Sequence, residues 1–179
     1  MLDTEKKKPV AAFISIGSNL GNKKENLLSA IAVLNAHAEI KMVEISPFYR
    51  TEPVDYLDQD WFVNAVLKIE TVLDPKQLLI VLKNTEKKLK QGKKSIRFGP
   101  RIIDLDIIYF GDVVLKTEEL TIPHPRMHQR FFVLKPLSDI EGKIVHPIYK
   151  LTPRELMDEL LNNLDDKDKQ GIIPLNEEE

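Results

Sequence analysis

The sequence predicts one α+β domain with the element order strand, helix, strand, strand, helix, strand. Apolar residues alternate with period two in four segments and recur at helical spacing in two others. The chain has 179 residues, of which 42% are hydrophobic, enough to bury one sizeable core. We see no internal repeat and no linker, so residues 1–164 are expected to form a single domain. This order is typical of the ferredoxin-like class, with a mainly antiparallel sheet, helices packed on one face, and C-terminal additions.

The first strand is predicted at residues 10–17, and a helix follows it. Asn22, with Glu25 three positions later, is a helix start signal, and the buried stripe then contains Leu27, Ile31 and Leu34. The turn between the strand and the helix contains Gly17 and Gly21, and a turn of this kind can cradle phosphate. Because it lacks the Gly-Lys-Ser/Thr ending of a P-loop, a tight structural turn is the favoured interpretation.

The second and third strands are predicted at residues 40–49 and 61–72. The second helix begins after Asp74, a strong N-cap followed by proline, and it ends at Gly92. Glu86 falls on the apolar side of this helix.

Phe62 and Asn64 share one face of the third strand. An aromatic ring beside a carboxamide can stack on a flat heterocycle and bind its edge. From these two residues alone, a packed Phe and a hydrogen-bonded core Asn remain the favoured alternative.

The last core strand follows the Gly99-Pro100 turn and places two carboxylates, Asp104 and Asp106, on one face. The other face is predicted to carry Ile103, Leu105, Ile107 and Tyr109. Carboxylates at positions i and i+2 lie roughly 6 to 7 Å apart. A hard divalent cation would compensate their repulsion. The alternative, a wet strand face with acids paired to ordinary lysines, is equally consistent with the strand alone.

Cationic residues surround this strand in sequence. Arg97 and Arg101 precede it, which suits an anionic phosphate substrate. The basic loop at residues 93–96 is a candidate lid, or else a solvated charge run. His124 lies between two prolines, close to further cationic residues, although a lone histidine is more often structural than catalytic.

A third capping box, Thr152 with Glu155, predicts a C-terminal helix. Residues 165–179 are expected to form a charged, poorly ordered tail.

Composition limits the function. The net charge of −2 gives no general reason to expect nucleic acid or membrane as a partner. The absence of cysteine excludes disulfides, thiolate nucleophiles and thiolate metal sites, and fits a reducing compartment. No signal sequence or stretch of membrane-spanning length is present, so a cytoplasmic location is expected. Separately, the protein is expected to be a monomer.

Five sequence blocks together resemble the 6-hydroxymethyl-7,8-dihydropterin pyrophosphokinases of folate synthesis. The resemblance covers roughly residues 10–161 in order, and its Gly-Pro-Arg-x-x-Asp-x-Asp block is specific. It implies transfer of pyrophosphate from ATP to the hydroxymethyl oxygen of 6-hydroxymethyl-7,8-dihydropterin, with release of AMP. The blocks are residues 13–22, 48–53, 62–65, 97–106 and 122–127.

The resemblance also implies roles for individual residues. Asp104 and Asp106 match ligands of two Mg²⁺ ions. Residues matching catalytic positions are Lys93, Arg97, Arg101, Asp104 and Asp106. Residues matching ATP-binding positions are Arg97, Arg101, Ile107, Thr121, His124 and Arg130. Residues matching pterin-binding positions are Thr51, Val54, Phe62, Asn64 and Phe132, with the two phenylalanines as stacking rings. The sequence departs from the family pattern at Lys93, Lys94, Phe98 and Glu119.

Two other functions share part of this pattern. A nucleotidyltransferase also combines a Gly-Ser turn with an Asp-x-Asp strand, but there the two lie close in sequence, whereas Gly17-Ser18 is far from Asp104. A non-catalytic ferredoxin-like module that binds RNA would expose aromatic residues on a basic sheet. The predicted sheet presents acids instead.

Overall fold

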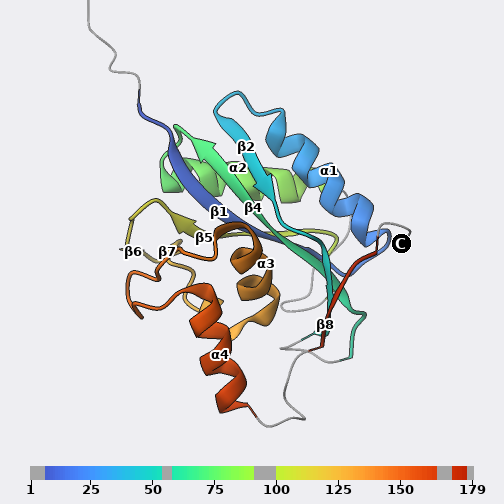
Figure 1. The fold of residues 1–179 in the computed structure, drawn as a ribbon. Helices are drawn as coiled ribbons and strands as arrows, with labels where there is room; N and C mark the ends of the chain where they lie inside the picture. Colours follow the sequence, from blue (N-terminus) through green and yellow to red (C-terminus); the bar gives the residue numbers. More distant parts are fainter. Residues whose placement is uncertain (1–6, 54–57, 91–99, 165–170, 177–179) are drawn as a thin grey trace, which may run out of the picture.

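Six strands form one antiparallel sheet in the computed structural model, which describes residues 7–53, 58–90, 100–164 and 171–176. The strand order is β5-β1-β4-β3-β8, and β2 pairs with β4 alongside β3 (Figure 1). The strands are β1 (Val10–Ser18), β2 (Ile40–Ile45), β3 (Tyr49–Thr51), β4 (Phe62–Thr71), β5 (Asp104–Phe110) and β8 (Ile172–Pro174), with a small separate hairpin of β6 (Leu115–Lys116) and β7 (Thr121–Ile122). The predicted core order is confirmed, except that the expected second strand is divided into β2 and β3.

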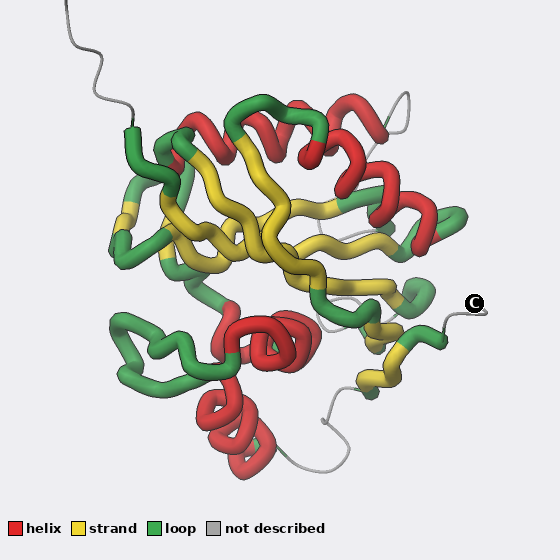
Figure 2. The backbone as a smooth tube through the Cα atoms, turned by 45° about the horizontal axis from the view of Figure 1, so that its top comes forward, coloured by secondary structure: helices red, strands yellow, loops and turns green. Residues whose placement is uncertain are grey.

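The helices cover both faces of the sheet (Figure 2). Helices α1 (Lys23–Asn35) and α2 (Pro75–Leu89) pack their leucines against one face. Helix α3 (Phe131–Glu141) packs against the opposite face, and α4 (Pro153–Asn163) packs against α3. The two core helices therefore share one face as predicted, and the C-terminal additions cover the other. Among the described residues, no helix is long and apolar enough to cross a membrane.

The predicted helix starts are confirmed by their hydrogen bonds. The Asn22 side chain accepts from the Glu25 backbone N–H at 3.2 Å. Asp74 and Thr152 each form a reciprocal capping box with the residue three positions later. These caps satisfy backbone donors that have no partner within the first turn of a helix.

A bulge in β5 changes which side chains face which core. Ile14 of β1 is opposite Ile107, but Phe13 is opposite Tyr109, so Ile108 is an extra residue in the ladder. Leu105 and Ile107 therefore pack toward α1 and α2, whereas Tyr109 packs with Phe13 on the α3 side. The prediction that Tyr109 shares a face with Ile107 is wrong, because the extra residue reverses the alternation.

The C-terminal segment corrects a second prediction. Residues 165–179 were expected to be a poorly ordered tail, but Ile172–Pro174 forms β8, which pairs antiparallel with β3. A strand of three residues is too short to show the alternation by which strands are recognised in a sequence. Its partner, β3, lies more than a hundred residues earlier.

Candidate active site

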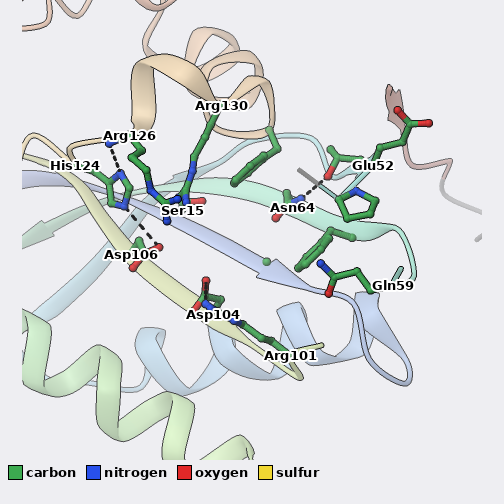
Figure 3. Close-up of a pocket in the computed structure, with 15 residues that line it drawn as sticks. Ser15, Glu52, Gln59, Asn64, Arg101, Asp104, Asp106, His124, Arg126 and Arg130 are labelled. Atoms are coloured by element: carbon green, nitrogen blue, oxygen red, sulfur yellow. Dashed lines mark hydrogen bonds and ion pairs between the residues drawn. The ribbon is translucent and has the colours of Figure 1, made fainter. Parts of the chain in front are cut away.

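A pocket opens on the sheet face that carries α3, where the ends of β1, β4 and β5 meet the segment leading into α3 (Figure 3). Its walls come from five separate stretches of the chain, so it exists only in the folded domain. The lining residues are Ser15, Gly17, Thr51, Glu52, Pro53, Gln59, Phe62, Asn64, Arg101, Asp104, Asp106, His124, Arg126, Arg130 and Phe132.

Asp104 and Asp106 form the acidic part of this pocket. Both project from the same face of β5, as the strand period predicted, and their side chains are 29% and 35% exposed. Their neighbours on β1 are Gly17, opposite Asp104, and Ser15, opposite Asp106. Because these two neighbours are small, the space in front of the carboxylates stays open to a ligand.

The surrounding charges affect the two carboxylates differently. Arg101 Nη1 lies 2.6 Å from Asp104 Oδ2, a short charge-assisted contact. Burial works against the charged form of Arg101, but the attraction and hydrogen bond of Asp104, together with the charges of Asp106 and Glu86, raise the pKa of Arg101. Burial, followed by repulsion from Asp104, raises the pKa of Asp106 to about 6. Burial and the charge of Asp104 therefore disfavour the carboxylate form of Asp106, and a bound cation would favour that form.

His124 faces Asp106 but stays neutral. Its Nε2 lies 4.0 Å from Asp106 Oδ2. Burial, followed by the charges of Arg130 and Arg126, lowers the pKa of His124 to about 4. Near pH 7 this ring can therefore donate or accept a hydrogen bond without adding a full charge.

Asn19 fixes the chain that leads into β5. Its Oδ1 accepts from the Arg101 backbone N–H at 2.6 Å, and its own N–H donates to the Arg101 carbonyl at 3.0 Å. Its Nδ2 donates to Gln59 Oε1 at 2.9 Å, and the residue is only 1% exposed. The turn after β1 is thus the structural element favoured from the sequence, and it joins two walls of the pocket.

Glu86 of α2 supports β5 from outside the pocket. Its Oε1 accepts from the Leu105 backbone N–H at 2.8 Å, between the two aspartates in sequence. Lys83 and Lys90 lie 3.1 and 3.2 Å from its carboxylate. A carboxylate that is only 6% exposed is thereby compensated, and it fixes the strand that carries Asp104 and Asp106.

The other end of the pocket suits a flat polar ring. Asn64 Nδ2 donates to Thr51 Oγ1 at 2.7 Å, which sets the orientation of the amide. A Cβ atom at Gly17 would lie 2.3 Å from Asn64 Oδ1, so only glycine fits beneath it. Phe62 and Phe132 line the same pocket, and the Arg130 guanidinium carbon lies 5.3 Å from the centre of the Phe132 ring.

The pocket gathers most of the residues singled out from the sequence, but not all. Those that line it are Thr51, Phe62, Asn64, Arg101, Asp104, Asp106, His124, Arg130 and Phe132. Ile107 does not: its side chain is 3% exposed and packs in the core against α1 and α2. Thr121 lies on β7 and is not among the lining residues. Val54, Lys93 and Arg97 lie outside the described residues.

Six lining residues were missed by the site prediction: Ser15, Gly17, Glu52, Pro53, Gln59 and Arg126. Arg126 follows the His124-Pro125 pair and had a detectable signal, its position within a cationic cluster. Ser15 and Gly17 could have been found from the face that they share across β1 and β5. Gln59 carries no local signal, because its place depends on the contact with Asn19.

The chain is similar in sequence to proteins of one known family. Residues 13–142 match the family described as 7,8-dihydro-6-hydroxymethylpterin-pyrophosphokinase (HPPK). The chain is 42% identical over 129 residues to the 2-amino-4-hydroxy-6-hydroxymethyldihydropteridine pyrophosphokinase of Bacillus subtilis, which covers 72% of this chain and 77% of that protein. It is also 42% identical over 164 residues to the folic acid synthesis protein fol1 of Pneumocystis carinii, with 92% of this chain and 21% of that protein covered.

Solved structures give the same fold. The HPPK-DHPS A437G of Plasmodium falciparum, crystallised with STZ-DHP, superposes with a TM-score of 0.70 at 17% identity over 92% of this chain and 48% of that one. The chain thus spans about a fifth of the fol1 protein and about half of the Plasmodium protein. On the match over residues 13–142 and the similarity to the Bacillus subtilis protein, this chain belongs to the 7,8-dihydro-6-hydroxymethylpterin-pyrophosphokinase family.

Proposed function

We propose that this protein transfers pyrophosphate from ATP to the hydroxymethyl group of 6-hydroxymethyl-7,8-dihydropterin, a step of tetrahydrofolate biosynthesis. The products are AMP and the pterin diphosphate. One observation carries the proposal: a single pocket joins a ring-binding end, with Asn64 and Phe62, to an acidic end with Asp104 and Asp106. A bisubstrate transfer needs this arrangement, because the two reacting groups must meet between the ends.

The ring-binding end supports recognition of the pterin. Phe62 and Phe132 are proposed to stack on the two faces of the ring, where aromatic contacts add to the burial of apolar area. The Asn64 amide, held by Thr51, presents an acceptor to the ring edge. Val54 is proposed from the sequence as a further contact.

The cationic residues support binding of the triphosphate. Arg101, Arg126 and Arg130 converge on the pocket, and a guanidinium can hold phosphate oxygens with two parallel hydrogen bonds. Arg97 and Lys93 are proposed from the sequence as further phosphate contacts.

The nucleoside is proposed to bind near neutral His124, Thr121 and β5. Because the Ile107 side chain is buried in the core, any contact of Ile107 with the nucleotide would use its backbone on this edge strand.

Asp104 and Asp106 fit a role as Mg²⁺ ligands. They are partly exposed oxygen donors on one face, and the pKa of Asp106 is raised by burial and by its neighbour. No group of three or more potential ligand side chains occurs among the described residues, so phosphate oxygens and water would complete the coordination, as Mg²⁺ prefers. Bound Mg²⁺ would neutralise charge on the triphosphate. Two ions are proposed from the family resemblance.

The proposed reaction is a displacement at phosphorus. The hydroxymethyl oxygen forms a bond to the β-phosphorus while the bond from that phosphorus to the α,β-bridging oxygen breaks. AMP leaves with the bridging oxygen, and the hydroxyl proton passes to solvent. The protein contributes mainly orientation and electrostatics, so no general base is assigned.

The structure changes the argument against a nucleotidyltransferase. Gly17 lies opposite Asp104 across β1 and β5, so the distance in sequence does not separate them in space. However, Ser18 is fully buried, and its hydroxyl accepts from Asn26 Nδ2 at 3.0 Å. This serine is thus engaged in holding the turn, which favours the pyrophosphokinase.

We also propose that the chain acts as a monomer in the cytoplasm. The absence of cysteine fits a reducing compartment. Light scattering coupled to size exclusion tests the monomer: one chain mass of 20.6 kDa is expected, and a stable multiple of it would contradict the proposal.

The activity is tested with ATP, Mg²⁺ and 6-hydroxymethyl-7,8-dihydropterin, with AMP and ADP followed in parallel. AMP that depends on the pterin, without ADP, is the expected result. The Asp104→Asn variant serves as the control and should form no AMP. Folded wild-type protein that forms no AMP, or that forms ADP in a pterin-dependent way, would contradict the proposed function.

A further inference from the structure

The C-terminal strand β8 (Figure 1) pairs with β3, the strand that carries Thr51 of the ring-binding end of the pocket. It falls outside residues 13–142, the part of the chain that matches the family. We propose that β8 is a positioning element for the ring substrate, which acts by holding Glu52 and Thr51 in place. This inference rests on the proposed function, because it assigns the pterin to that end.

Backbone hydrogen bonds join the C-terminal segment to the pocket wall. In the ladder between β3 and β8, Thr51 lies opposite Ile172. Beyond one end of the ladder, the Glu52 N–H donates to the Gly171 carbonyl at 3.0 Å. Beyond the other end, the Leu175 N–H donates to the Phe48 carbonyl at 2.8 Å. Without these contacts, β3 would be a three-residue edge strand held by β4 alone.

Gly171 also holds the Glu52 side chain in place. Its N–H donates to Glu52 Oε2 at 2.8 Å, so Glu52 and Gly171 are joined twice. Figure 3 shows the Glu52 carboxylate turned away from Asn64. The C-terminal segment therefore keeps a negative charge out of the part of the pocket where the Asn64 amide must meet the ring edge.

A side chain at position 171 would meet the Glu52 side chain. A Cβ atom there would lie 2.9 Å from Glu52 Cδ and 3.2 Å from the Trp61 ring. Glu52 Cδ is near the end of a flexible side chain, so Gly171→Ala should displace the carboxylate and still allow folding. This substitution leaves every residue that lines the pocket unchanged, since Gly171 is not one of them.

The link from β8 to substrate recognition runs through Thr51. Thr51 is completely buried, and its hydroxyl accepts the hydrogen bond that orients Asn64. A small movement of β3 therefore changes both the wall at Glu52 and the amide at Asn64. The acidic end of the pocket is formed by β5 and by the segment before α3, whereas β8 pairs with β3. The expected effect is thus confined to the ring substrate.

The test measures the dissociation constant of 6-hydroxymethyl-7,8-dihydropterin by calorimetry, with Mg²⁺ and α,β-methylene-ATP present. This nucleotide keeps the site filled, because its α,β bridge cannot be broken by the transfer. For Gly171→Ala we expect a rise of roughly tenfold, the size of about one lost hydrogen bond to the ring. The dissociation constant of the nucleotide should stay within about twofold, a change too small to indicate a lost contact.

Two further variants separate positioning from general loosening. The Glu52→Ala, Gly171→Ala double variant should bind the pterin no more weakly than Glu52→Ala alone, because no carboxylate remains to be displaced. Ile173→Thr is the matched control: its side chain is 51% exposed on the same strand, and binding should not change.

The outcomes are distinct. If wild-type protein binds and converts the pterin but Gly171→Ala binds it equally well, the inference is wrong and the proposed function stands. If Gly171→Ala weakens pterin and nucleotide equally, β8 is only a stabilising strand and the inference is also wrong. If wild-type protein neither binds nor converts the pterin, the proposed function itself fails.

Discussion

The amide oxygen of Asn64 occupies the space directly above Gly17, 2.3 Å from where a Cβ atom at that position would lie. The close approach joins the two central strands of the pocket, since Gly17 is in β1 and Asn64 is opposite it in β4. The glycine at position 17 thus leaves room for the Asn64 amide at the ring-binding end of the pocket.

Gly17→Ala should therefore weaken binding of the pterin. The added methyl group would push the Asn64 amide from its place beside Thr51, and we expect the KM for the pterin to rise at least roughly tenfold. Steady-state kinetics with each substrate varied measures the effect. The Gly17→Ala, Asn64→Ala double variant is the control, and it should be no worse than Asn64→Ala alone. An unchanged KM in Gly17→Ala would show that the amide does not contact the ring.

Asp106→Asn should lower activity and raise stability together. The pKa of Asp106 is raised by burial and by Asp104, which means that its charged form destabilises the fold at neutral pH. Removing that charge should gain about 1 kcal/mol after allowance for solvent screening, or roughly 3 °C in Tm. Thermal unfolding of metal-free protein and AMP release measure the two effects. Retained activity, or a lower Tm, would contradict the assigned role.

Asn19→Ala should lower both stability and turnover. It removes the acceptor of the Arg101 backbone N–H at a site that is 1% exposed. An unpaired buried donor lowers the free energy of unfolding by about 2 kcal/mol. The backbone at Arg101 would also no longer be held in place, so its side chain would be less well positioned. Urea unfolding and kcat measure the two losses. Asn35→Ala, at the exposed end of α1, is the matched control and should change neither stability nor kcat. A normal kcat in Asn19→Ala would show that the position of Arg101 does not matter for catalysis.

His146 should make the fold sensitive to acid. Burial, followed by the charge of His128, lowers the pKa of His146 from 6.5 to about 4. Its Nδ1 accepts from the backbone N–H groups of Ile148 and Tyr149, which requires that nitrogen to be unprotonated. The unfolded chain binds the proton at higher pH than the fold does. The free energy of unfolding should therefore fall as the pH decreases from about 6.5 to 4, by at most about 1.4 kcal/mol per unit for this group.

The His146→Asn variant isolates that contribution. An asparagine oxygen can accept from the same two backbone N–H groups, but it does not titrate. Urea unfolding at several pH values should show a shallower slope for the variant between pH 4 and 6.5, with His124 and His128 still contributing. An equal slope in both proteins would contradict the role of His146.

Local patterns predicted the elements and much of the pocket. The period of β5 placed Asp104 and Asp106 together, and the caps at Asn22, Asp74 and Thr152 began helices as expected. These features depend on residues that are close in sequence, so one segment contains the whole signal.

Features set by distant contacts were not predictable in this way. The bulge at Ile108 moved Tyr109 to the other core, and nothing in the apolar run marks it. The contact of Asn19 with Arg101 spans 82 residues, and β8 is a strand only because β3 offers it an open edge. The burial of Ile107 likewise follows from the packing of α1 and α2 on β5.

The most direct test of the central claim follows the hydroxymethyl oxygen of the substrate. The pterin is labelled with ¹⁸O at that position, and the products are examined by mass spectrometry and ³¹P NMR. Attack of this oxygen on the β-phosphorus predicts that the label stays in the carbon–oxygen–phosphorus bridge of the pterin diphosphate, with unlabelled AMP formed in equal amount. Label in AMP, or a pterin monophosphate with ADP, would contradict pyrophosphate transfer.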